Sequence, residues 1–171
     1  MPRYVAFLRG VSPMNARMAD LKRCFEAAGF SDVKTILSSG NVAFEARAGS
    51  EAALVRSIEA AMAQHLGRTF QTTVRRTDAL RKLVETDPYA GFDVPANAKR
   101  VVTFLREPLR KKPALPIATD GVLILATDGR EVFTAYVAHP KGPVFMTLIE
   151  KTFGVDLTTR TWDTVKKCAS A

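Results

Sequence analysis

The residues of this chain that are best suited to chemistry lie in two short polar stretches, at positions 9–15 and 38–41. The first stretch supplies a guanidinium and small polar groups, and the second supplies two hydroxyls, a glycine and an amide. Groups of this kind beside a helix N-terminus can hold an anion, because each of them can donate hydrogen bonds. The candidate anion site consists of Arg9, Gly10, Ser12, Asn15, Ser38, Ser39, Gly40 and Asn41.

These residues are scattered in sequence, so their convergence depends on strand direction. If the first two strands belong to a split βαββαβ unit, the first strand ends where the hairpin between strands two and three turns. The helix that starts near Met18 to Asp20 begins at the same end, with its free amides. The structural alternative is that Ser39 and Gly40 only make the turn while Asn41 fixes the neighbouring loop. Both interpretations stay open at this point.

A second candidate site is formed by Arg160 and Trp162, which precede the last predicted helix. The alternative is that the tryptophan anchors this helix in the core, with its N–H bonded to the backbone.

No metal site or cofactor is expected. Neither histidine has the spacing of a metal ligand pair with a Cys, Asp or Glu, and the two cysteines are too few for a disulfide framework. Cys24 shares a helical face with Leu21 and Phe25, which indicates a buried thiol. Gly-rich nucleotide-binding loops, His-Glu-x-x-His and Gly-x-Ser-x-Gly are also missing.

The net charge of +8 allows attraction to nucleic acid or to small anions. Basic residues cluster at positions 75–76, 81–82, 99–100 and 106–113. RNA-recognition modules stack bases on aromatic residues of their third strand, but Asn41 and Ala43 occupy those positions here. Any nucleic-acid binding is therefore predicted to be weak, non-specific and dependent on phosphate contacts.

The elements that must position the first candidate site follow from hydrophobic periodicity. The pattern predicts strands at 4–9, 33–37, 41–46 and 70–75, with helices at 18–28 and from Ser50 to a stop at Gly67. The first strand is apolar on both faces, which is typical of a central strand. After a connector with a helix at 77–86, a second series gives strands at 100–106, 122–126, 131–138 and 156–161, and helices at 144–153 and 162–169. Prolines interrupt the stretch up to position 119.

The predicted fold class is α+β, with two tandem ferredoxin-like (split βαββαβ) units and mainly antiparallel sheets. The predicted domains are a first unit at 1–76, a helical connector at 77–98, and a second unit with a C-terminal helix at 99–171. No apolar run approaches the roughly 20 residues of a membrane span, and the start lacks a signal-peptide pattern. We therefore expect a cytoplasmic protein without membrane contact, and nothing in the sequence indicates an oligomeric state.

Three ordered motifs carry a resemblance to a known family. They are "YVAFLRG", "MADLKRCFEAAGFSDVKTILSSGNVAFEA" and "TTRTWDTVKK". The chain resembles the bacterial family known as domain of unknown function 1697 along essentially its whole length. The resemblance implies two ferredoxin-like units and a cytoplasmic bacterial protein, and it brings no catalytic residues with it. The chain departs from the family pattern at Pro13 and Met14, where many members have a glycine pair, and at Thr161 and Asp163, where Asn is common.

The sequence favours a binding module for a small anionic ligand. A nucleic-acid-binding protein without sequence preference and an enzyme with an unrecognised active site are the alternatives. A concave cup would favour the small ligand, and a continuous basic stripe would favour nucleic acid.

Overall fold

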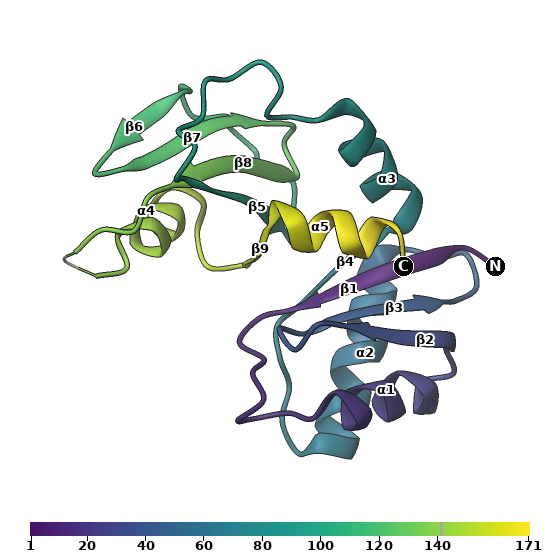
Figure 1. Ribbon diagram of the computed structural model, residues 1–171. Coiled ribbons are helices and arrows are strands. Elements are labelled where there is room, and N and C mark those ends of the chain that lie inside the picture. Colours follow the sequence, from purple (N-terminus) through teal and green to yellow (C-terminus); the bar gives the residue numbers. More distant parts are fainter. Residues whose placement is uncertain (141) are drawn as a thin grey trace. The chain divides into compact units, whose positions relative to one another are not determined.

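The computed structural model describes residues 1–140 and 142–171 of the chain (Figure 1). Within these residues the protein is an α+β structure with two antiparallel sheets and five helices. Two compact units divide it, residues 1–85 with 166–171 (unit 1) and residues 86–165 (unit 2). The α+β class and the antiparallel sheets agree with the sequence, while the predicted domain boundaries at 76 and 99 stay a prediction.

Unit 1 contains the first four strands and the first three helices. They are β1 (Arg3–Leu8), α1 (Met18–Ala27), β2 (Ser31–Ile36), β3 (Asn41–Glu45), α2 (Glu51–Leu66), β4 (Thr72–Arg76) and α3 (Thr77–Thr86). The strand order is β2-β3-β1-β4, and every pairing is antiparallel. The C-terminal residues belong to the same unit, because Arg3 Nε donates to the Ala171 carbonyl at 3.0 Å and Arg81 Nε donates to the Ala169 carbonyl at 3.1 Å.

The core of unit 1 lies between its sheet and the helices α1 and α2. Every residue from Tyr4 to Leu8 is at most 1% exposed, which confirms the predicted central strand. The rings of Phe25, Phe30 and Phe44 pack together with centroid distances of 4.6 to 6.2 Å. The bounds of α2 follow from its caps, because Ser50 accepts a hydrogen bond from the Ala53 amide and Gly67 ends the helix in the left-handed conformation.

Unit 2 contains the second sheet and the helix α4. Its elements are β5 (Lys99–Leu105), β6 (Ile117–Thr119), β7 (Val122–Thr127), β8 (Glu131–Tyr136), α4 (Val144–Phe153) and β9 (Leu157–Thr161), and α5 (Trp162–Ala169) starts in it. The strand order is β6-β7-β8-β5-β9, again antiparallel throughout. The sequence pattern missed β6, a three-residue strand directly after Pro116. A proline before a short edge strand hides the strand signal, although edge positions tolerate proline well.

Tyr89 holds the segment between α3 and β5, residues 87–98, against the sheet of unit 2. Its side chain is 2% exposed, and its hydroxyl lies 2.9 Å from the carbonyl oxygens of both Val101 and Thr134. The ring packs edge-on against Trp162 with a centroid distance of 5.5 Å. Burial raises the pKa of the Tyr89 hydroxyl well above its usual value, since the phenolate would lose its hydration.

Tyr89→Phe is expected to lower the free energy of unfolding at pH 7 by roughly 1–2 kcal/mol, because it removes a buried hydrogen bond. A raised pKa also makes the wild-type protein lose stability as the pH rises above about 10, where the unfolded state ionises first. The variant lacks this contribution, so the stability difference should shrink at alkaline pH. Urea unfolding at pH 7 and pH 10.5 measures both effects, and a difference that stays constant between the two pH values would contradict this account.

Candidate functional site

The predicted convergence of the two polar stretches is present at one end of the unit 1 sheet. The amide of Leu8 donates to the Gly40 carbonyl at 2.8 Å, and the Arg9 amide donates to the Gln71 carbonyl at 2.8 Å. The end of β1, the turn before β3 and the segment before β4 therefore meet. Figure 1 shows the loop to α1 leaving from the same end. We name this region, made of residues 9–27, 37–41 and 65–71, the basic end of unit 1.

Gly40 is where the turn approaches β1 most closely. Its φ is +88°, and a Cβ atom at this position would lie 2.8 Å from Val11 Cβ and 3.1 Å from Leu8 Cβ. Both contacts involve atoms fixed to the backbone, so a side chain here would force the turn away from the strand. The glycine thus positions the turn.

Asn41 is fully buried at the start of β3. Its Nδ2 donates to the Ile36 carbonyl and to Ser39 Oγ, both at 2.9 Å. The side chain therefore closes the turn between β2 and β3. These two bonds lie within the turn itself, whereas the structural interpretation expected Asn41 to fix the neighbouring loop.

The loop from Gly10 to Ala16 is likewise closed by its own side chains. Asn15 Nδ2 donates to the Gly10 carbonyl at 2.8 Å, and Asn15 Oδ1 accepts from the Ser12 amide at 2.9 Å. Ser12 Oγ accepts from the Met14 amide at 3.3 Å. These bonds fix the shape of the loop that leads into α1.

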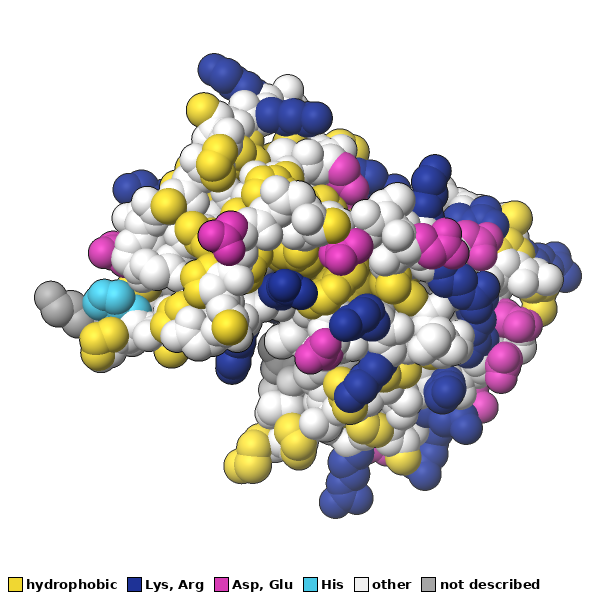
Figure 2. All heavy atoms as spheres, turned by 45° about the horizontal axis from the view of Figure 1, so that its top comes forward, with side chains coloured by type: hydrophobic (Ala, Val, Ile, Leu, Met, Phe, Trp, Pro, Cys, Tyr) yellow, Lys and Arg dark blue, Asp and Glu magenta, His cyan; other side chains and the backbone are white. Residues whose placement is uncertain are grey.

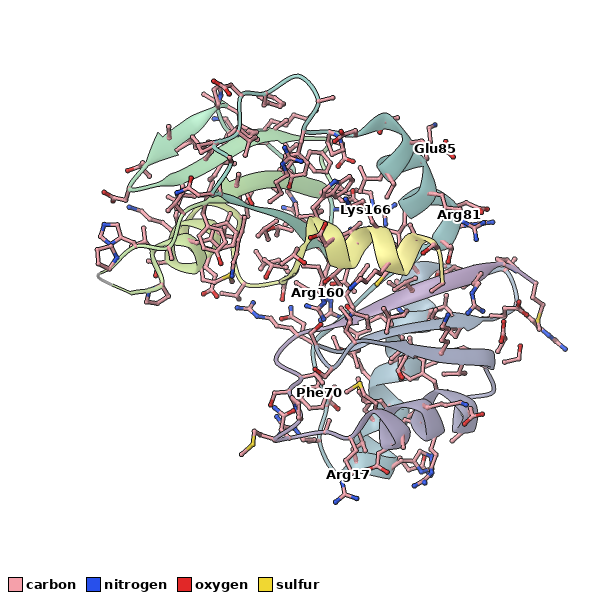
Figure 3. The ribbon with its side chains drawn as sticks, in the orientation of Figure 1. Arg17, Phe70, Arg81, Glu85, Arg160 and Lys166 are labelled. Atoms are coloured by element: carbon pink, nitrogen blue, oxygen red, sulfur yellow. The ribbon has the colours of Figure 1, made fainter. Side chains whose placement is uncertain are left out.

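Other polar groups of the basic end are more accessible. Ser38 and Arg17 are exposed, whereas Arg9 is half-buried. Arg17 is the N-cap residue of α1 and makes no side-chain cap within the described residues, because a guanidinium has only donors. Figure 3 shows its side chain extending outward from the start of α1. Arg68 lies over the ring of Phe70 at 4.4 Å.

A pocket of about 510 Å³ opens between α1 and α2 at this end. It is lined by Asp20, Arg23, Cys24, Ala27, His65 and Leu66. Arg23 Nη1 bonds to Asp20 Oδ1 at 3.2 Å, and the Arg23 side chain is 77% exposed at the pocket. Sequence reasoning treated Cys24 and His65 separately and missed this hollow. The hollow lies where one face of α1, from Asp20 to Ala27, packs beside the last turn of α2.

Cys24 contributes a neutral thiol to this pocket. Burial raises its pKa, and the carboxylate of Asp20 raises it further. The nucleophilic form of cysteine is the thiolate, and a raised pKa makes that form scarce at neutral pH. A thiolate nucleophile at Cys24 is therefore disfavoured.

Charge is distributed unequally between the two units. Unit 1 contains 15 Lys and Arg against 8 Asp and Glu, whereas unit 2 contains 10 against 9. The net charge is therefore +7 in unit 1 and +1 in unit 2. Figure 2 shows acidic side chains among the basic ones on the face drawn.

The second candidate site, Arg160 and Trp162, consists of side chains that are buried or half-buried. Trp162 is 6% exposed and packs against the ring of Tyr89. Arg160 is half-buried, and its Nη1 donates to the Thr159 carbonyl at 2.7 Å. These contacts fit an anchoring role for the tryptophan.

The described part of the chain lacks two features, a metal-binding cluster and a membrane-spanning helix. Residues 1–140 and 142–171 contain no cluster of three or more His, Cys, Asp or Glu side chains that could hold a metal ion. Over the same residues, each helix is too short or too polar to cross a bilayer.

Comparison with known proteins gives a family and a fold. Residues 1–133 match the profile of the family described as Protein of unknown function (DUF1697). The structure is similar to that of conserved bacterial protein SP0830 from Streptococcus pneumoniae, with a TM-score of 0.73 and 20% identity. The similarity covers 99% of this chain and 97% of that chain, and at this identity it shows the fold alone. No curated protein matches the chain.

Proposed function

The chain belongs to the DUF1697 family of proteins of unknown function, and we propose that it binds a small anionic ligand at the basic end of unit 1. The observation that carries the proposal is the pocket between α1 and α2, which has Arg23 and His65 in its wall and lies in the unit with a net charge of +7. Arg17 and Arg68 lie at the same end of the unit.

The size of the pocket favours a small ligand over a polymer. A volume of about 510 Å³ falls within the roughly 300–1,000 Å³ that is usual for small-molecule sites. A guanidinium offers five donors, so Arg23 can bond to Asp20 and still donate to a ligand oxygen. Phosphate and carboxylate groups are the natural acceptors for such a fork.

The residues of the original candidate site remain part of the proposal in a supporting role. Ser12, Asn15, Ser39 and Asn41 hold the loop and the turn in shape. Arg9 and Ser38 lie at the same end of the unit, where Ser38 is exposed and Arg9 is half-buried. The neutral thiol of Cys24 makes catalysis by a thiolate unfavourable in this pocket.

Calorimetric titration with inorganic pyrophosphate tests the proposal. Arg23→Ala is expected to weaken binding about 10-fold or more, because it removes charge-assisted hydrogen bonds. Arg56→Ala is the matched control, since it removes the same charge from an exposed position in the first half of α2. Asp20→Asn should strengthen binding, because it removes a like charge from the pocket wall.

Comparing Arg23→Ala with Arg56→Ala separates binding in the pocket from general attraction of the anion to a basic surface. Equal weakening by Arg23→Ala and Arg56→Ala, with binding that vanishes at physiological salt, would indicate only a basic surface and would contradict the proposal. Failure of pyrophosphate and of a thermal-shift panel of nucleotides and phosphorylated metabolites to bind would also contradict it.

We also infer that both units follow one ferredoxin-like plan. When β6 is left out and the strands are numbered within each unit, the order β7-β8-β5-β9 of unit 2 has the same form as β2-β3-β1-β4 of unit 1. Helix α4 then corresponds to α2. The segment with Pro113 and Pro116, together with β6, stands in place of the first helix.

A further inference from the structure

Unit 2 contains a separate pocket between the end of β8 and the start of α4. Its volume is about 260 Å³. The residues that line it include Tyr136, Ala138, Val144, Phe145 and Met146. His139 and Gly142, two of the residues at the pocket, pair with each other in a β-bridge. All of these residues belong to unit 2, so the pocket is independent of the basic end of unit 1.

The walls of this pocket are predominantly apolar and include an aromatic pair. The rings of Tyr136 and Phe145 stack with a centroid distance of 4.4 Å and an interplanar angle of 11°. The pair comes from two different elements, the last residue of β8 and the first turn of α4. Met146 adds a thioether, which contacts aromatic rings favourably. Since the two rings cover each other's inner faces, a flat aromatic molecule would contact the edge or an outer face of the pair, with Met146 beside it.

The volume limits the size of the occupant. An apolar cavity of about 150 Å³ can hold one benzene ring, and drug-sized ligands need roughly 300 Å³ or more. At about 260 Å³, this pocket has room for a molecule of one or two fused rings.

We propose that the pocket is a second ligand site, which binds a small planar aromatic molecule of one or two rings beside the Tyr136 and Phe145 pair. The occupant gains from apolar burial and from stacking, so its charge contributes little. An aliphatic molecule of the same size gains the burial but not the stacking. The site should therefore discriminate between aromatic and saturated rings.

Ligand-observed NMR with indole as the probe tests the proposal. We expect saturation transfer to indole, together with a shift of the Met146 methyl resonance, and much weaker effects with cyclohexanol. Ala138→Trp is the blocking variant. Ala138 is exposed at the pocket, so the large side chain can enter it without disturbing the sheet. Ala118→Trp is the control, because Ala118 is exposed on β6 and lies outside the lining.

The expected result is a loss of indole binding of at least about 10-fold in Ala138→Trp and no change in Ala118→Trp. Val144→Asp provides a second block, since it places a carboxylate in the apolar wall. Circular dichroism establishes that each variant is folded before it is compared. Unchanged indole binding in both folded blocking variants, or equal binding of indole and cyclohexanol, would overturn the proposal.

Discussion

Gly40→Ala is expected to lower the free energy of unfolding by roughly 2–4 kcal/mol, through two separate effects at one position. The first effect is the backbone conformation, because a φ of +88° strains any residue with a Cβ. The second is the contact of that Cβ with Val11 Cβ at 2.8 Å and with Leu8 Cβ at 3.1 Å. Urea unfolding of the variant measures the sum.

Gly10→Ala separates the two effects. Gly10 has nearly the same φ, +86°, but a Cβ there would have no atom within 4 Å. This variant is expected to cost only the backbone strain of about 1–2 kcal/mol. If the two variants lose the same stability, the close approach of the turn to β1 contributes nothing and our description of the turn is wrong.

Trp162→Ala is expected to lower the free energy of unfolding by roughly 3–5 kcal/mol, the usual cost of removing a buried tryptophan side chain. The residue is 6% exposed, and its ring is the edge-on partner of Tyr89. Truncation leaves a void and removes the aromatic contact. Thermal or urea unfolding followed by far-UV circular dichroism measures the loss, because the variant has no tryptophan fluorescence.

Two further variants decide between the anchoring and the binding roles of this position. Trp162→Phe keeps an aromatic ring and should recover part of the stability. Arg160→Ala should leave pyrophosphate binding unchanged if the ligand occupies the basic end of unit 1. A folded Trp162→Ala protein with full stability and lost anion binding would make Arg160 and Trp162 the functional site.

The regular elements were predictable where capping and periodicity agreed. The structure places α2 at Glu51–Leu66 between the predicted start at Ser50 and stop at Gly67. The helices at 77–86, 144–153 and 162–169 have the predicted bounds. In each case, apolar residues recur at helical spacing, so local sequence and tertiary packing favour the same structure.

The sequence predicted that the end of β1 and the turn before β3 meet, but it predicted only in part what each residue does there. Strand direction alone brought the end of β1 beside the turn, and the bond between Leu8 and Gly40 confirms that meeting. Whether Asn41 faces a ligand or its own turn depends on side-chain geometry, and no periodicity encodes that geometry. The pocket with Arg23 and His65 depends on helix packing between distant segments, which the sequence does not express locally.

The most direct test of the central claim is a pyrophosphate titration followed by two-dimensional NMR of the backbone amides. The account predicts saturable shift changes concentrated at Arg17 to Cys24 in α1 and at His65 to Phe70, with few changes in unit 2. These changes should be lost in Arg23→Ala and retained in Arg56→Ala. Small, unsaturable changes spread over basic residues of both units would contradict a small-anion site at the basic end of unit 1.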